Sequence, residues 1–240
     1  MAQAYTEKGL QMQADVKSFM DDHIYPNEEE YYEEKRSLDN IHATPPMMEK
    51  LKAAARERGL WNLFIPHLDP QAPGTKLSNL DYAPISEELG KVTFASEALN
   101  CAAPDTGNME ILNLYASDAV KERWLAPLLQ GDIRSAFSMT EPDVASSDAS
   151  NIELSIEKDG DHYVLNGKKW FSSNALRPEC EILIVMGKTN PGEAKHRQQA
   201  MIAVPKDTPG VSIGRDPLVF GYHDRGGHPE IIYDNVRVPE

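Results

Sequence analysis

Residues 137–148 read FSMTEPDVASSD, and residues 166–174 read NGKKWFSSN. Each of these two segments places short hydroxyl side chains beside aromatic or thioether side chains. That combination suits a flat heteroaromatic ring, because such a ring rests on an apolar surface and hydrogen-bonds along its polar edge. The two segments therefore predict a binding site for a planar cofactor.

The region before these segments has the pattern of helices. Apolar side chains recur at helical spacing near the start, at Leu10, Met12, Val16, Phe19 and Met20. The acidic run at 28–34 is interpreted as a solvated helix face with two tyrosines turned inward. Further helices are expected at 47–58, from 78 to about 90, at 108–115 and at 121–129. Thr44, Ser78 and Ser117 are their predicted N-caps, and Gly59 and Gly131 their predicted ends.

After Gly131 the period of the pattern changes to that of strands. Ile152, Leu154 and Ile156 alternate with polar residues, as in a half-buried strand. Other short apolar runs lie at 163–165, 182–186, 200–204, 211–213 and 230–238. A turn is expected at 158–161, and Asn166-Gly167 is a strong hairpin signal. The fold class predicted is α+β: an all-α domain at 1–133, then an antiparallel β-barrel or sandwich domain at 134–240.

The amino-acid composition argues against several classes of binding partner and against some cellular locations. The formal net charge of −14 argues against nucleic acid and against an anionic membrane surface. The two cysteines, Cys101 and Cys180, are too few for a disulfide framework, and no CxxC pair indicates zinc. No apolar run is long enough to span a membrane, and the start lacks a secretory signal. A cytoplasmic protein, or one of an organellar matrix, is expected.

Two groups of polar residues have a catalytic and a structural interpretation. Glu141 could be a general base, but a carboxylate beside proline in a binding loop is more often an acceptor for backbone N–H groups. His223 and His228 lie in the glycine-rich run 221–228. Without a further ligand pair at helical spacing, we interpret them as surface or gating histidines and predict no metal site. No GxGxxG follows a strand, which argues against a Rossmann fold.

The paired segments, the helical-then-β order and the ending Val236-Arg237-Val238-Pro239 resemble the acyl-CoA dehydrogenase family. The run TEPDVASSD is similar to a branch whose animal members carry a phosphotransferase-like domain in front. The resemblance extends from about residue 10 to the end. It implies FAD as cofactor.

The resemblance also implies roles for individual residues. Backbone groups of Phe137 and Met139 and the hydroxyl of Thr140 would meet the pyrimidine edge of the flavin. Phe171 would stack near the ring, and Ser173 would hydrogen-bond toward N5. One extra residue between Glu141 and Asp148 leaves open whether Ser146 or Ser147 approaches the cofactor pyrophosphate or the CoA of the substrate. The cofactor-binding residues expected are thus Phe137, Met139, Thr140, Ser146, Ser147, Phe171 and Ser173, with Ser147 also expected to bind substrate.

The reaction implied is α,β-dehydrogenation of a fatty acyl-CoA to the trans-2-enoyl-CoA, as in fatty acid β-oxidation. A carboxylate removes the α-proton while hydride leaves the β-carbon for the flavin. In the family that carboxylate lies in a C-terminal helical domain, so no catalytic residue is assigned here. We expect either a fragment or a short subunit that another polypeptide completes.

An electron-transfer flavoprotein or similar acceptor and a homodimer or homotetramer are the expected partners. The alternatives are a non-catalytic flavin-binding subunit and a same-fold acyl-CoA oxidase or flavin monooxygenase. The residues do not fix the acyl chain length.

Overall fold

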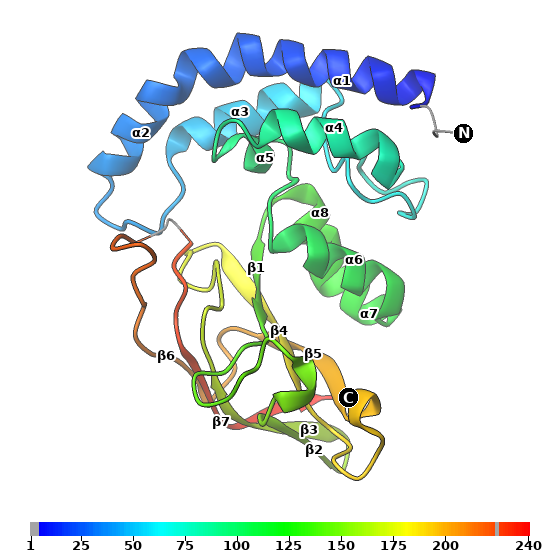
Figure 1. The fold of residues 1–240 in the computed structure, drawn as a ribbon, viewed down its shortest axis with the longest axis vertical. Coiled ribbons are helices and arrows are strands. Elements are labelled where there is room, and N and C mark those ends of the chain that lie inside the picture. The colour runs from blue at the N-terminus through cyan, green and yellow to red at the C-terminus, as the bar shows by residue number, and fades with distance from the viewer. Residues whose placement is uncertain (1–4, 224–225) are drawn as a thin grey trace. The chain divides into compact units, whose positions relative to one another are not determined.

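The computed structural model describes residues 5–223 and 226–240. The chain divides into two compact units between Asp132 and Ile133. Helices make up the first unit and strands dominate the second (Figure 1). The expected α+β class, with a helical region followed by a β region, is therefore confirmed. No helix in the described ranges is long and apolar enough to cross a membrane.

In the helical unit, α1 (Glu7–Phe19) runs through a π-helical turn, η1 (Met20–Ile24), and a 3-10 turn, η2 (Tyr25–Asn27), into α2 (Glu28–Ser37). Together they form one long, curved helical run, blue in Figure 1. The other helical elements are α3 (Pro46–Glu57), α4 (Asn79–Leu89), α5 (Ala95–Ala98), α6 (Asp105–Tyr115), α7 (Asp118–Val120), η3 (Lys121–Leu125) and α8 (Ala126–Gln130). Of the two tyrosines in the acidic run, Tyr31 is buried and stacks on Phe94 at 3.8 Å.

The start of α1 is anchored on α4 through one carboxylate. Thr6 caps α1 by accepting a hydrogen bond from the Gly9 N–H. Asp81 in turn accepts from the Thr6 N–H at 2.8 Å and from its hydroxyl at 2.9 Å. Ser78 caps α4 by accepting from the Asp81 N–H, as expected. A side chain on Gly9 would overlap Asp81, so this contact requires a glycine inside the helix.

At the buried end of α8, side chains from other parts of the helical unit donate hydrogen bonds to the last carbonyl groups of the helix. Free carbonyl groups at a helix C-terminus need partners when water is excluded. The Leu129 carbonyl accepts from the Trp61 indole and from the Asn62 amide, both at 2.8 Å. The Asn100 amide donates to Leu128 at 2.9 Å and to the Asn62 side chain at 2.7 Å. Gly131, in the left-handed conformation, ends the helix as expected.

In the described part of the second unit, seven strands form one sheet in the order β1-β4-β2-β3-β7-β6, with β5 also paired to β4. The strands are β1 (Arg134–Ser138), β2 (Ser155–Asp159), β3 (His162–Lys169), β4 (Cys180–Lys188), β5 (Gln199–Pro205), β6 (Val211–Ile213) and β7 (Ile231–Pro239). Two 3-10 turns, η4 (Ala149–Asn151) and η5 (Lys195–Arg197), lie in the connections. Ile152, Leu154 and Ile156 are all buried in its core, as their alternation predicts. Only Ile156 lies in a strand, however, because β2 begins at Ser155.

The sheet is mixed, which corrects the expectation of purely antiparallel pairing. β1 pairs with β4 in parallel, and Ser155 of β2 also makes a parallel pair with Lys188 of β4. Parallel neighbours need a long crossover, and the chain between β1 and β4 supplies one that contains the β2–β3 hairpin. β1 itself was missed in the sequence because its five residues, RSAFS, show no alternation of apolar and polar residues.

Two other local predictions were wrong. Thr44 is not the N-cap of α3: the cap is Pro45, which makes no side-chain cap bond, and Pro46 is the first helical residue. Asn166-Gly167 is not a hairpin turn but lies within β3, where the register against β7 shifts between Leu165 and Gly167. A side chain on Gly167 would press on Leu154, so this glycine serves a β-bulge and a close approach.

Candidate functional site

The two segments that the sequence singled out meet in space, one after β1 and one after β3. The Trp170 N–H donates to the Thr140 carbonyl at 3.0 Å, and the Thr140 hydroxyl donates to the Trp170 carbonyl at 2.9 Å. Because the Thr140 hydrogen is engaged in this bond, its oxygen can offer a ligand only lone pairs. Phe137 lies in β1 opposite Ile184, and Met139 packs against the core of the sheet.

A buried lysine ties the segments together. The Lys169 ammonium, whose side chain is 0% exposed, donates to the Met139 carbonyl at 2.7 Å and to Glu141 Oε1 at 2.8 Å. Burial lowers the pKa of this amine, and the hydrogen bond and the charge of Glu141 oppose that shift. Sequence reasoning gave Lys169 no role, because nothing in the local pattern shows that its neighbours are Met139 and Glu141.

Glu141 is a structural acceptor, as the second of the two interpretations held. Its Oε2 accepts from the Glu153 N–H at 2.8 Å, and its Oε1 accepts from the Leu154 N–H at 2.9 Å as well as from Lys169. The side chain is nearly fully buried. These contacts hold the loop after Pro142 against the start of β2, and they leave the carboxylate poorly placed to act as a base.

A second buried link lies beside the first. The Tyr233 hydroxyl donates to Ser138 at 3.0 Å, and the hydroxyls of Ser138 and Ser172 lie 3.0 Å apart. Burial raises the pKa of Tyr233 well above its ordinary value, which keeps the phenol protonated as the donor of this chain. β1, β7 and the segment after β3 are thus joined by hydroxyl groups as well as by the ion pair.

The predicted stacking residue and its neighbour lie at the surface of this junction. Phe171 is 42% exposed and adopts a positive φ of 50°, which is rare for a residue with a side chain. Ser173 is half-buried, and its hydroxyl lies 2.7 Å from Nδ1 of His228. An accessible aromatic ring and a hydroxyl are therefore placed two residues apart, with a fixed backbone between them.

The two serines of the first segment have different environments. Ser146 is buried, and its hydroxyl accepts from the Glu141 N–H at 2.6 Å and donates to the Glu141 carbonyl at 3.1 Å. Ser147 is exposed. Ser146 is engaged in holding the loop, whereas the Ser147 side chain faces solvent.

The histidines of the run 221–228 have carboxylate and hydroxyl neighbours. His223 Nδ1 lies 2.8 Å from Asp216 Oδ2, and His228 Nδ1 bonds to Ser173. Asp224 and Arg225 of that run lie outside the described residues. Among the residues that are described, no cluster of three or more His, Cys, Asp or Glu side chains could hold a metal ion.

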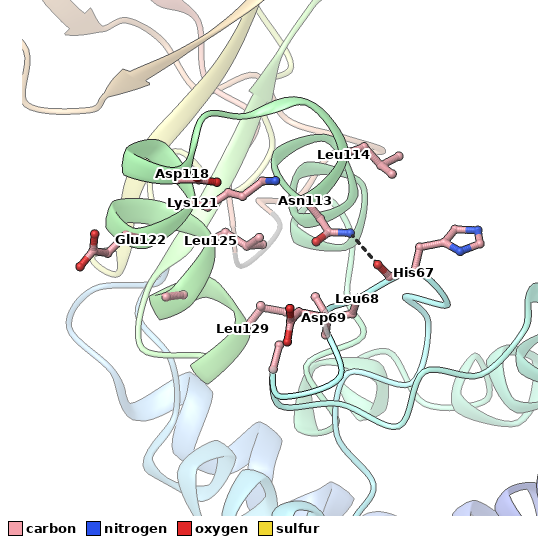
Figure 2. A pocket seen from close by; sticks show the side chains of 12 residues that line it. His67, Leu68, Asp69, Asn113, Leu114, Asp118, Lys121, Glu122, Leu125 and Leu129 are labelled. Atoms are coloured by element: carbon pink, nitrogen blue, oxygen red, sulfur yellow. Dashed lines mark hydrogen bonds between the residues drawn. The ribbon is translucent and has the colours of Figure 1, made fainter.

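Two hollows in the surface contain none of the predicted site residues. One, of about 590 Å³, lies on the helical unit between the loop 67–72 and the segment from α6 to α8. Figure 2 shows Leu114 and Leu125 beside the charged Asp118, Lys121 and Glu122, with the Asn113 amide bonded to the His67 carbonyl. The other, of about 400 Å³, lies on the β unit around Ile156, Tyr163 and Met201. The hydroxyl and aromatic residues of the two segments thus lie outside both hollows.

Comparison with known protein families divides the chain in the same way. Residues 6–132 match the N-terminal domain of acyl-CoA dehydrogenases, and residues 136–236 match their middle domain. Each match falls entirely within one structural unit.

Individual relatives extend these matches over nearly the whole chain. It is 52% identical to a probable acyl-CoA dehydrogenase, FadE2, of Mycobacterium tuberculosis over 98% of its length. Human acyl-CoA dehydrogenase family member 11 is also 52% identical, again over 98% of this chain. A solved structure of a putative acyl-CoA dehydrogenase from Mycobacterium abscessus superposes with a TM-score of 0.91 at 43% identity.

These relatives are all longer proteins. The chain spans 57% of the FadE2 relative, 30% of the human relative and 60% of the chain solved from Mycobacterium abscessus. A glutaryl-CoA dehydrogenase of Mycobacterium smegmatis, solved with FADH2, shares the fold at a TM-score of 0.71 and 24% identity. With both domain models matched along its length, the chain belongs to the acyl-CoA dehydrogenase family.

Proposed function

We propose that this chain forms the flavin-binding part of an FAD-dependent acyl-CoA dehydrogenase, which converts a fatty acyl-CoA to the trans-2-enoyl-CoA. The observation that carries the proposal is the junction of the two segments. There the Thr140–Trp170 hydrogen bonds and the buried Lys169 hold an exposed aromatic ring beside hydroxyl groups. An isoalloxazine needs such a surface: an apolar face and a polar edge.

The residues at the junction fit the cofactor in a specific way. Thr140 offers a lone pair, which suits the one N–H group on the pyrimidine edge of the flavin. Backbone groups of Phe137 and Met139 serve the same edge, with the Met139 carbonyl already engaged by Lys169. Phe171 would cover part of the ring, and Ser173 would face N5. FAD, when bound, accepts the hydride that leaves the β-carbon of the substrate.

The substrate contact in this chain is assigned to Ser147. Its hydroxyl is exposed, whereas the Ser146 hydroxyl is bonded to both backbone groups of Glu141. Ser147 can therefore donate to a phosphate oxygen of CoA or of the cofactor without breaking an internal bond. Ser146 supports binding indirectly, by fixing the loop that carries Ser147.

No base for the α-proton is assigned to this chain. Glu141 is the carboxylate nearest in sequence to the site, but three donors occupy it, and one of them is a buried ammonium. Removal of the proton requires a carboxylate within hydrogen-bond reach of the α-carbon. We therefore propose that another part of the protein supplies that group and that an electron-transfer flavoprotein or similar acceptor reoxidises the flavin.

The test of cofactor binding compares variants of the intact protein. Wild-type protein should purify with FAD or take it up, and Thr140→Ala combined with Ser173→Ala should weaken FAD binding by tenfold or more. Thr208→Ala is the matched control, because its hydroxyl donates to the Pro205 carbonyl away from both segments. Equal FAD affinity in the double variant and the control would contradict the assignment of these segments.

The test of the reaction separates the dehydrogenase from its alternatives. With a fatty acyl-CoA and an artificial electron acceptor, the intact protein should form the trans-2-enoyl-CoA under anaerobic conditions. Ser147→Ala should raise KM for the acyl-CoA more than it lowers kcat. Product formation that requires oxygen would identify an oxidase or monooxygenase, and bound FAD without any turnover would identify a flavin-binding subunit.

A further inference from the structure

Ser173 has a neighbour that the flavin assignment does not use. Its Oγ lies 2.7 Å from Nδ1 of His228, and both residues are half-buried. The ring of Phe171 lies 6.4 Å from the imidazole, centroid to centroid. The hydroxyl that we place toward flavin N5 therefore has an imidazole bonded to it from the protein side.

The backbone holds His228 in place on two sides. His228 donates its own N–H to Asp216 Oδ1 at 2.7 Å. The strip 226–229 also runs along the strip 172–176. Three backbone hydrogen bonds of 3.3 to 3.4 Å join these strips: Ser172 N–H to Pro229, Asn174 N–H to Gly227, and Leu176 N–H to Gly226. The imidazole is thus fixed relative to the backbone that carries Ser173.

Two glycines make this close approach possible. A Cβ on Gly226 would overlap the side-chain oxygen of Asn174 and press on its backbone, and a Cβ on Gly227 would overlap the end of the Leu176 side chain. Gly227 also has a φ of 61°, which a residue with a side chain rarely adopts. The sequence Gly226-Gly227-His228 is therefore built to bring an imidazole against Ser173.

The imidazole decides what the hydroxyl can offer to a ligand. A serine hydroxyl has one hydrogen and two lone pairs. If Nδ1 carries a hydrogen and donates it to Oγ, the serine hydrogen remains available for a second acceptor. If Nδ1 is bare and accepts, that hydrogen is used, and the hydroxyl can only accept. N5 of an oxidised flavin is an acceptor, so it matches the first arrangement.

We propose that His228 is a positioning residue for the flavin: its Nδ1–H donates to Ser173 and thereby directs the Ser173 hydrogen toward N5. This inference rests on the proposed function, since it needs FAD at the junction. N5 gains a hydrogen when the flavin accepts a hydride, so a hydrogen bond in which the Ser173 hydroxyl donates to N5 exists only with the oxidised flavin. His228 therefore stabilises the oxidised flavin and lowers its midpoint potential through Ser173, without touching the substrate.

The test measures that midpoint potential in the intact FAD-loaded protein. His228→Leu and Ser173→Ala should each raise it by the same amount, and the double variant should raise it no further. We expect at least a tenfold change in the ratio of reduced to oxidised flavin, roughly 30 mV for a two-electron couple. His228→Asn should restore the wild-type value, because the asparagine amide nitrogen occupies the place of Nδ1.

Two further variants test whether the change in potential comes from the loss of the hydrogen bond to Ser173 rather than from any substitution in this loop. His228→Gln keeps a polar amide but carries it toward the place of Nε2, so it should resemble His228→Leu. It also replaces that variant if the leucine prevents folding. His223→Leu is the matched control in the same loop, because His223 bonds to Asp216 and not to Ser173. Its potential should equal that of the wild type.

Each contrary result has a distinct meaning. Additive shifts in the double variant, failure of asparagine to restore the potential, or an unchanged potential in His228→Leu would overturn the role of His228 while leaving the flavin assignment intact. A wild-type protein that takes up no FAD would overturn the proposed function, and this inference with it.

Discussion

At the scale of single residues, Lys169 explains how two distant segments become one surface. A fully buried ammonium is costly unless each of its hydrogens finds an acceptor. Met139 and Glu141 provide two of these acceptors, and both lie in the segment that follows β1. Glu141 in turn needs Lys169, because its remaining partners are neutral N–H groups. Removing either partner leaves the other charge buried.

Lys169→Met should therefore destabilise the β unit by about 3–5 kcal/mol, the usual cost of breaking a buried ion pair. The double variant Lys169→Met with Glu141→Gln should recover part of that loss, since it leaves no uncompensated charge. Lys158→Met is the matched control, because its partner Glu240 is exposed, and it should leave stability nearly unchanged. Chemical denaturation measures all three, and a Lys169→Met variant as stable as the control would refute the argument.

At the scale of elements, the N-terminus of α1 depends on the charge of Asp81. Hydrogen bonds from the Thr6 N–H, and further ones from the hydroxyls of Ser78 and Thr6, lower the pKa of this carboxyl below its ordinary 3.8. A carboxyl whose pKa is lower in the folded state contributes stability above its unfolded pKa. That contribution disappears as the pH falls through the folded value.

Asp81→Asn should therefore be less stable than the wild type at pH 6, and the difference should shrink as the pH falls below 3.8. Thermal unfolding at pH 6 and at successive values below pH 4 measures the effect. Asp15→Asn is the control, since Asp15 accepts a hydrogen bond from Gln11 on the same helix and holds no second element. A constant difference across this pH range would show that the carboxylate charge is not what anchors α1.

The elements also show which parts of the fold a sequence can predict. The change of period after Gly131, the cap at Ser78 and the buried alternation from Ile152 to Ile156 depend on neighbours in the chain, and all three were predicted. Asn166-Gly167 was misassigned because the glycine is required for close packing against Leu154, a contact that the local sequence does not show. β1 was missed because nearly all of its residues are buried, so its sequence lacks the alternation of apolar and polar residues that marks a half-buried strand.

The candidate site divides in the same manner. The two segments were recognisable from their hydroxyl and aromatic residues, and the structural role of Glu141 followed from its place beside Pro142. The partners of Lys169 and Ser173 were not predictable, since they lie 28 to 55 residues away along the chain. Contacts between segments decide which hydroxyl groups can bind a ligand. These contacts cannot be predicted from the residues on either side of each hydroxyl.

At the scale of the whole molecule, the net charge of the chain limits how the proposed acyl-CoA substrate can be recognised. The chain has 24 basic and 38 acidic residues. Its net charge of −14 gives a weak or repulsive long-range interaction with the phosphates of CoA. Donors at single positions, such as Ser147, can bind a phosphate locally, but they supply no general attraction. Under the proposed function, we therefore expect most of the affinity for the substrate to come from burial of its acyl chain.

In the intact protein, KM should therefore fall as the acyl chain lengthens, until the pocket is full. Each buried methylene contributes about 0.8 kcal/mol, which corresponds to roughly a fourfold change in KM where KM reports binding. Raising the salt concentration should change KM little, since screening acts on charge and not on apolar burial. Steady-state kinetics with a series of saturated acyl-CoA esters at low and high salt measures both effects. Because electrostatic attraction and apolar burial respond to different variables, a KM that ignored chain length but rose steeply with salt would show that charge dominates recognition.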